Sequence, residues 1–271
     1  MFENEPPLDS PLIGAPNFVA TPHLGASTRE SQRNVGLLIA EQVADALDHG
    51  IFREAVNIPV SDWQTYDRLK PQLELVKRMG SLAQQYADGA ISEVQIEYCG
   101  EGFDELDGIN NTLLQGLMGA VAESAVNAVN APVLARERGI ALSFTESDAS
   151  TGYRQLVRLR VRVGDRYHSF SATTFSDGEP RLVEIDGFSV ELILTGVLII
   201  FGNYDKPGVI GGLGSVLGEN GINIAHFSLG RRDRGGEAMG ILAVDERVDD
   251  GVVALIAELP NMQWVSQIVL D

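Results

Sequence analysis

The segment Asn203-Tyr204-Asp205-Lys206-Pro207-Gly208 decides the fold of the C-terminal part of the chain, because two different apolar patterns meet there. Before it, residues 197–203 form the continuous apolar run of a buried strand. After it, Pro207 and Gly208 open a predicted helix over residues 208–220. The segment therefore predicts a strand that turns tightly into a helix.

Outward from this segment, the pattern continues in a regular order to the end of the chain. Residues 223–229 and 238–244 read as strands joined by the polar, glycine-rich tip 231–237, and a helix over 249–259 precedes a last strand over 263–270. The order strand, helix, strand, strand, helix, strand predicts a ferredoxin-like sandwich for residues 196–271, with two helices on a four-stranded antiparallel sheet.

Two motifs in this region carry a resemblance to a known module. The pieces 203–208 and Gly221-Ile222-Asn223-Ile224-Ala225 resemble an ACT domain, the regulatory module that binds amino acids. The resemblance implies L-serine as the effector and a homo-oligomer whose ACT domains pair edge to edge. It places the effector site at the following positions: Asn203, Asp205, Pro207, Gly208 and Asn223.

The residue types at these positions suit a zwitterionic ligand. The free amides at the start of the helix after Pro207 favour a carboxylate, and Gly208 permits close backbone approach. Asp205 can meet the ammonium group, while Asn203 and Asn223 can bond either the ligand or a partner subunit. A structural interpretation stays open, with Asp205 as a helix cap and Asn223 as a turn residue.

The middle of the chain, residues 62–195, predicts an α/β domain. Its expected helices begin at Pro71, span 112–130 and run from Pro132 to Gly139; its expected strands are 91–98, 140–145, 155–163, 166–175, 181–185 and 188–194, with Asp186-Gly187 as a hairpin turn. The domain resembles the intervening, or allosteric substrate-binding, domain of the longer D-3-phosphoglycerate dehydrogenases, most closely at 125–140 (AVNAVNAPVLARERGI).

A row of arginines in this domain allows two interpretations. Arg158, Arg160 and Arg162 share one face of their strand, and the family resemblance makes a regulatory anion site possible. Alternatively, they pair across the sheet with Glu93 and Glu97, which form a matching acidic row. The sequence favours the pairing.

The N-terminal part, residues 1–61, contains the motif Thr21-Pro22-His23-Leu24-Gly25-Ala26-Ser27-Thr28 between an expected strand at 18–20 and a helix at 28–49. Pro22 and Gly25 shape a turn, and Ser27 or Thr28 can cap the helix. Together with the expected strand at 55–60 (AVNIPV), the motif resembles the end of the catalytic region of D-3-phosphoglycerate dehydrogenase. The resemblance assigns His23 the role of general acid/base in hydride transfer.

The resemblance also implies NAD as the family cofactor and 3-phosphoglycerate as the family substrate. The family's dinucleotide-binding domain and the partners of the catalytic histidine precede the motif, in sequence that this chain does not contain. Gly212-Leu213-Gly214 falls inside an expected helix and does not follow a strand, so it is no dinucleotide fingerprint. We expect a truncated chain, or a gene fragment starting at an internal Met1, that neither binds NAD nor oxidises 3-phosphoglycerate.

Composition narrows the class of protein. The 271 residues include 38 acidic and 20 basic side chains, for a net charge of −18, which disfavours nucleic acid as a partner. The single cysteine, Cys99, argues against a disulfide or a cysteine-ligated metal site. The sequence has neither a long apolar run nor a signal peptide, so we expect no membrane association and a cytoplasmic location.

Two other functions remain open at this point. One is a freestanding ACT module that senses serine or another amino acid, although such a sensor has no use for the motif around His23. The other is a subunit of L-serine dehydratase, whose iron-sulfur part the cysteine count excludes. The remaining histidines, His49, His168 and His226, are expected to be structural or exposed.

Overall fold

The computed structural model describes residues 7, 10–22, 24–49, 54–55, 63–100, 103, 105–122, 125–149, 151–175 and 178–270. The chain divides into two compact units, residues 1–54 and residues 55–271. Within the described parts of both units, no helix is long and apolar enough to cross a membrane.

The first unit is built on helix α1 (Arg29–His49). Thr28 caps this helix as predicted, because its Oγ1 accepts the N–H of Ser31 at 3.0 Å. The strand expected at 18–20 is wrong: these residues are irregular, since no neighbouring strand pairs with them in the described part of the unit. Of the strand expected at 55–60, residues 56–60 lie outside the described residues.

Helix α1 carries several apolar side chains that are exposed within its unit. Its larger side chains are between 51% and 81% exposed: Val35, Leu37, Leu38, Ile39, Val43 and Leu47. So many exposed apolar side chains are unusual on one helix.

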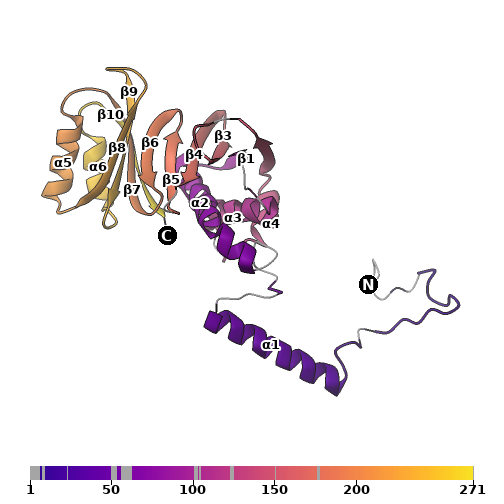
Figure 1. The fold of residues 1–271 in the computed structure, drawn as a ribbon. Coiled ribbons are helices and arrows are strands. Elements are labelled where there is room, and N and C mark those ends of the chain that lie inside the picture. The colour runs from indigo at the N-terminus through magenta and orange to yellow at the C-terminus, as the bar shows by residue number, and fades with distance from the viewer. Residues whose placement is uncertain are drawn as a thin grey trace. The chain divides into compact units, whose positions relative to one another are not determined.

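The second unit begins with an α/β arrangement (Figure 1). Its elements are α2 (Trp63–Ala87), β1 (Ile91–Gly100), α3 (Leu106–Gly119), α4 (Ala131–Glu137), β2 (Ala141–Ser147), β3 (Gln155–Val163), β4 (Arg166–Thr174), β5 (Pro180–Ile185) and β6 (Phe188–Ile193). The strands form one sheet in the order β2-β1-β3-β4-β5-β6, in which β1 and β2 are parallel and the other neighbours are antiparallel. The α/β architecture predicted for this region is confirmed.

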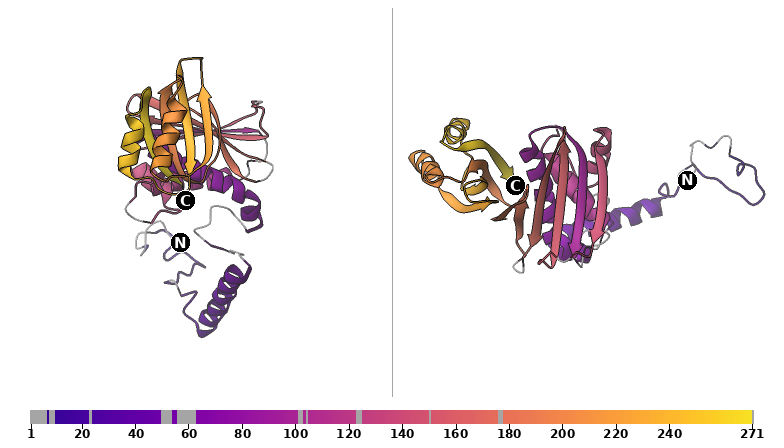
Figure 2. Two further views of the ribbon diagram at one scale, coloured as in Figure 1. Left: turned by 90° about the vertical axis from the view of Figure 1, so that its left-hand side faces the viewer. Right: turned by 90° about the horizontal axis from the view of Figure 1, so that it is seen from above.

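Helices α2 and α3 cover one face of this sheet, as the view from above in Figure 2 shows. The alternation of apolar and polar residues along β1 determines which face the helices cover. The apolar residues Val94, Ile96 and Tyr98 point toward the helices and are at most 1% exposed. The backbones of the two helices approach closely at Gly116, where a Cβ atom would lie 1.8 Å from the carbonyl oxygen of Lys77. Only glycine fits this contact.

The helix expected over residues 112–130 is wrong in its limits, since α3 spans Leu106–Gly119. Beyond it, the side chains of Asn127 and Asn130 each accept the backbone N–H of the other, at distances of 3.0 and 2.8 Å. These local bonds compete with the helical ladder and hold the segment in a turn. Helix α2 also begins before the expected Pro71, because Leu69 joins the core at 1% exposure.

The C-terminal elements form the predicted ferredoxin-like sandwich. They are β7 (Gly196–Tyr204), α5 (Val209–Glu219), β8 (Ile224–Arg231), β9 (Glu237–Val244), α6 (Asp250–Ala257) and β10 (Met262–Leu270). The antiparallel sheet has the order β10-β7-β9-β8. Side chains including Ile199, Phe201 and Leu213 form the core under α5 and α6, which lie on the side of this sheet away from the six-stranded sheet (Figure 2).

The opposite face of the four-stranded sheet packs against β6 and α2. One continuous apolar core contains Val190 and Leu192 of β6 with Ile200, Met239 and Ile268 of the four-stranded sheet. The two folds of the second unit therefore share a hydrophobic core, which favours their behaviour as a single body.

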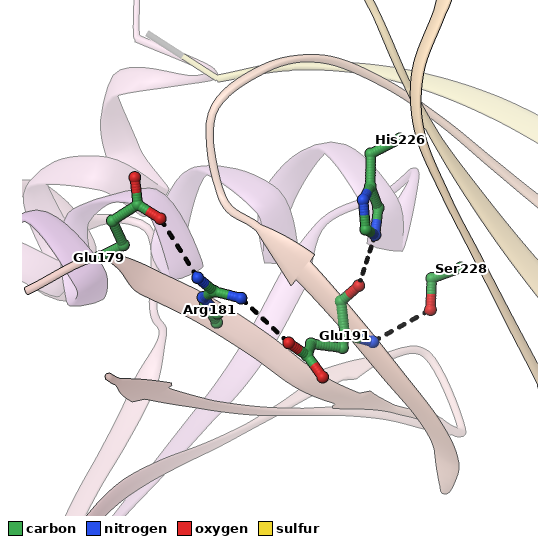
Figure 3. Close-up of polar contacts among 5 residues, drawn as sticks. All are labelled: Glu179, Arg181, Glu191, His226 and Ser228. Atoms are coloured by element: carbon green, nitrogen blue, oxygen red, sulfur yellow. Dashed lines mark hydrogen bonds and ion pairs between the residues drawn. The ribbon is translucent and has the colours of Figure 1, made fainter. Parts of the chain in front are cut away.

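Side chains from each fold also cap an edge strand of the other. The Gln85 amide donates to the Val269 carbonyl oxygen at 2.8 Å and accepts the Val269 N–H at 3.0 Å, which closes the edge of β10. At β6, Ser228 Oγ accepts the Glu191 N–H and His226 Nε2 donates to the Glu191 carbonyl oxygen, both at 3.0 Å (Figure 3). These contacts satisfy backbone groups that the sheets leave unpaired.

Candidate functional site

The connection from β7 to α5 is built to expose the start of a helix. Gly208 is the residue before α5 and has a φ of 100°, a left-handed conformation that favours glycine. The chain reverses there, and the first amides of α5 have no partner within the helix itself. Together with the helix dipole, they offer a site for an anionic group such as a carboxylate.

Asp205 lies before this turn and makes three hydrogen bonds to the hairpin between β8 and β9. Its Oδ2 accepts from Arg231 Nη1 at 2.9 Å and from the Gly235 N–H at 3.1 Å, and its own N–H donates to the Gly236 carbonyl oxygen at 2.8 Å. The Gly235 N–H and the Arg231 guanidinium hold the pKa of the Asp205 carboxyl below its usual value. Asp205 is therefore an anion at neutral pH.

Asp205 does not cap α5. The residue at the cap position is Gly208, and the cap has no side-chain hydrogen bond. The interpretation of Asp205 as a helix cap is therefore wrong, and its carboxylate serves the hairpin instead.

Asn203 has a buried acceptor beside this turn. Its residue is 3% exposed, and its Nδ2 donates to the Tyr204 carbonyl oxygen at 2.8 Å. Its Oδ1 is buried and has no hydrogen-bond partner among the described residues. A buried acceptor without a donor costs about 1–3 kcal/mol, so a bound ammonium group there would relieve a real penalty.

Asn223 lies apart from the other predicted site residues. The register of β8 and β9 pairs Arg231 with Ala238 at one end and Ile224 with Val244 at the other, so Asn223 lies at the far end of β8 from Asp205. Its Nδ2 donates to Asp245 Oδ2 at 2.8 Å. Within one chain, the structure brings together Asn203, Asp205, Pro207 and Gly208 but not Asn223.

Sequence reasoning missed Arg231 and Gly235 at this site. Both belong to the segment that was interpreted only as a polar hairpin tip. The available signal was topological: in a sheet of order β10-β7-β9-β8, the β8–β9 hairpin lies at the same end as the C-terminus of β7. The strand order therefore places the guanidinium of Arg231 beside Asp205.

The arginine row of the six-stranded sheet is paired, as the sequence favoured. Arg158 contacts Glu97 at 3.0 Å, and Arg162 contacts Glu93 at 3.7 Å. Arg160 lies over the Tyr167 ring at 4.0 Å. Hydrogen bonds from Gln95 and Tyr167 lower the pKa of Glu93, which keeps this row ionised.

Arg181, on β5, bridges two carboxylates across the same sheet. Its guanidinium contacts Glu179 at 3.3 Å and Glu191 at 3.0 Å, as Figure 3 shows. Because its charge is shared by two acids, this region does not present a free cationic patch around Arg181.

The predicted catalytic residue, His23, lies outside the described residues. The motif Gly212-Leu213-Gly214 does not fit a dinucleotide, because it lies within α5 and Leu213 is 1% exposed in the core. A pyrophosphate-binding loop needs free amides at a strand-to-helix turn. No step of hydride transfer follows from these residues.

His168, His226 and Cys99 have structural surroundings. His168 Nδ1 lies 3.0 Å from Asp186 Oδ2, and His226 caps Glu191. Cys99 is buried and reduced, and burial raises the pKa of its thiol. Within the ranges that the structure describes, no cluster of three or more His, Cys, Asp or Glu side chains suits a metal ion.

Comparison with known proteins defines the class. Residues 68–186 match the D-3-phosphoglycerate dehydrogenase intervening domain, and residues 197–261 match the ACT domain. The chain thus carries two domains of a multidomain, ACT-containing protein, arranged as the fold shows.

The whole chain is similar to dehydrogenases of the same name as the intervening domain. The chain is 35% identical over 272 residues to D-3-phosphoglycerate dehydrogenase of Methanocaldococcus jannaschii and 36% identical over 272 residues to that of Bacillus subtilis, covering 100% of this chain and 51% and 52% of those relatives. The Archaeoglobus fulgidus relative is 35% identical over 91% of this chain and 47% of its own length. The chain is thus similar over its whole length to D-3-phosphoglycerate dehydrogenases, and it spans about half the length of the curated relatives it matches, their C-terminal half.

Proposed function

We propose that this chain supplies the regulatory part of an NAD-dependent D-3-phosphoglycerate dehydrogenase, the oxidoreductase that converts 3-phosphoglycerate to 3-phosphohydroxypyruvate at the first step of L-serine synthesis. The proposed domains are residues 1–61 from the catalytic region, 62–195 as the intervening domain and 196–271 as the ACT domain. The observation that carries the proposal is the effector geometry at the β7–α5 turn, in a chain similar throughout to dehydrogenases of that name.

L-serine fits this turn as a feedback effector. The α5 amides suit its carboxylate, while the Asp205 carboxylate and the buried Asn203 Oδ1 suit its ammonium group. Groups that are already fixed in the protein can thereby pair with both charges of the ligand, which limits the entropy lost on binding.

The proposed site is completed by a second copy of the chain. Strand β8 is an edge of its sheet, with Ile224 and Leu229 at 36% and 38% exposure. Antiparallel pairing of β8 with β8 of another copy would bring the start of one strand beside the end of the other. Asn223 of the partner subunit would then lie near Asp205, which explains why one chain separates them.

Calorimetry with L-serine tests the effector site. We expect binding to the 271-residue chain, and we expect Asp205→Asn to weaken it at least tenfold, because a charged hydrogen bond to the ammonium contributes about 1.5–3 kcal/mol. Glu246→Gln, which removes an exposed acid elsewhere in the domain, is the matched control. Equal affinity for Asp205→Asn and the wild type contradicts the assignment.

An activity assay tests the proposed role of the other half. Hydride transfer needs the dinucleotide and substrate sites beside His23, so the chain alone is expected to show no 3-phosphoglycerate-dependent NADH formation above background. Measurable turnover by the purified chain contradicts this expectation. A freestanding sensor would also bind serine without turnover. Co-expression with the N-terminal half of a relative distinguishes the two functions, because activity is restored only if this chain is the regulatory part of a dehydrogenase.

A further inference from the structure

Two adjacent residues of the hairpin between β8 and β9 contact two different parts of the second unit. Arg231 is the last residue of β8, and Arg232 is the first residue beyond it. Because successive side chains of an extended chain point to opposite sides, one arginine reaches the effector turn and the other reaches the six-stranded sheet. The hairpin is thus a physical link between the two folds.

Arg231 pairs with the same carboxylate that the proposed ligand ammonium would use. Its Nη1 lies 2.9 Å from Asp205 Oδ2, the same oxygen that accepts the Gly235 N–H. A guanidinium and an ammonium on one carboxylate repel each other at this range. The Arg231 side chain is 57% exposed, so the ion pair is weak enough for a ligand to displace.

Arg232 holds the turn between β5 and β6. Its guanidinium donates to the Asp186 carbonyl oxygen and lies over the Phe188 ring at 4.5 Å. Asp186 and Gly187 have φ values of 48° and 79°, so this is the tight two-residue turn that the sequence predicted. Gly187 adjoins the guanidinium, since a Cβ there would lie 3.4 Å from Arg232 Nη2, in van der Waals contact.

The Asp186 side chain anchors this turn inside the intervening domain. Its carboxylate accepts the Tyr86 hydroxyl at 2.9 Å and the Ser169 N–H at 2.7 Å, and it lies 3.0 Å from His168 Nδ1. Tyr86 belongs to α2, and Ser169 belongs to β4. A change at the turn is therefore passed to a helix and a strand of the intervening domain.

We propose that Arg231 is a built-in competitor for the effector ammonium, and that its displacement loosens the grip of Arg232 on the Asp186-Gly187 turn. This inference rests on the proposed effector site at Asp205. In the free chain, Arg231 neutralises Asp205 and holds the hairpin against the β7–α5 turn, while Arg232 contacts the intervening domain. When the ammonium takes the carboxylate, the hairpin loses the ion pair of Arg231 with Asp205, and the neighbouring Arg232 loses its fixed position.

Linkage makes the proposal quantitative. If the effector weakens the contact between Arg232 and the turn, then removing that contact must strengthen effector binding by the same factor. Both arginines act through one element, so their effects are expected to be non-additive.

Calorimetry with L-serine on four variants tests the competition. We expect Arg231→Gln to bind about two- to fivefold more tightly than the wild type, the range of an exposed ion pair. Arg232→Gln is expected to bind more tightly by a smaller factor, and the double variant no more tightly than Arg231→Gln alone. Arg231→Lys restores the cation and is expected to return the affinity toward that of the wild type.

Hydrogen exchange at residues 231–237 and 185–188 tests the link between the hairpin and the Asp186-Gly187 turn. The comparison of the variant with the wild type needs no ligand. Arg231→Gln is expected to speed exchange in both segments, and added L-serine to speed it in the wild type but not further in the variant. Arg247→Gln, which removes an exposed arginine of the same domain, is the matched control and is expected to leave the exchange rates of both segments unchanged.

The outcomes separate the two proposals. Serine binding that Arg231→Gln weakens or leaves unchanged overturns the competition and leaves the effector site in place. Unchanged exchange at 185–188 in Arg231→Gln overturns the link to the intervening domain. An absence of serine binding in the wild type and in every variant overturns the effector site itself, and the competition with it.

Discussion

At the scale of single residues, Tyr98 and Asn110 form a polar contact that is sealed inside the α/β core. The Tyr98 hydroxyl donates to Asn110 Oδ1 at 2.6 Å, and the two residues are 1% and 6% exposed. Helix α3 begins at Leu106 and carries Asn110 into the core. A buried amide is tolerated there because the tyrosine satisfies it.

Tyr98→Phe is expected to lower the free energy of unfolding by about 1–3 kcal/mol, because it leaves the Asn110 oxygen buried without a donor. Urea denaturation followed by circular dichroism measures the change. Tyr153→Phe, at a residue that is 40% exposed, is the control and is expected to be neutral. A neutral Tyr98→Phe would mean that water reaches Asn110.

Burial also makes the two core tyrosines sensitive to high pH. Desolvation raises the pKa values of Tyr86 and Tyr98, for Tyr86 with a further contribution from Asp186. Because the folded-state pKa is raised, the two neutral tyrosines contribute stability that is fully present below the unfolded-state pKa of about 10. This contribution is lost as the pH rises above that value. We expect stability to fall above about pH 10, and to fall less steeply in Tyr98→Phe when urea midpoints are compared across that range.

At the scale of elements, the α2–α3 contact depends on glycines rather than on side-chain interlocking. At Gly80 a Cβ would lie 2.2 Å from the Leu113 carbonyl oxygen, and Gly116 makes the reciprocal close approach to Lys77. The helices therefore meet backbone to backbone, a contact that no hydrophobic pattern encodes.

Gly116→Ala is expected to destabilise the chain by about 1–3 kcal/mol or more, because the new methyl group must push the two helices apart. Gly119→Ala, in the same helix with nothing within 4 Å of the added Cβ, is expected to be neutral or stabilising by up to about 1 kcal/mol. Thermal denaturation compares the two. Equal loss in both would show that the close approach at Gly116 relaxes at little cost.

At the scale of the whole molecule, the intervening and ACT folds are joined by a shared core and by side chains that cap strand edges. Gln85 holds both backbone groups of Val269, and Tyr86 contacts the Trp264 ring edge to face at 5.6 Å. These contacts predict one cooperative unfolding transition for residues 63–270.

Gln85→Ala is expected to lower the free energy of unfolding by about 1–2 kcal/mol and to speed exchange of the Val269 amide, since both of its backbone partners are lost. Gln84→Ala removes an exposed amide that bonds only the Gly89 carbonyl oxygen, and is the matched control. Two separate transitions in the wild type would contradict the single-body description.

The sequence by itself determined the features that depend on neighbouring residues. The alternation in β1, the Asp186-Gly187 turn, the cap at Thr28 and the order of elements around Asp205 were all predictable, because each follows from local backbone preference or from the period of the side chains. The ladder of Arg158 and Arg162 with the glutamates of β1 was predictable for the same reason, once the strands were adjacent.

Only the tertiary structure decided the rest. The helix expected to reach residue 130 ends at Gly119, and two asparagine side chains hold residues 127–130 in a turn. Arg231 reaches Asp205, Arg232 reaches Asp186, and Asn223 lies at the opposite end of its strand, all because of strand order and register. Such contacts join residues far apart in the chain, and a local pattern carries no information on which distant groups the packing brings together.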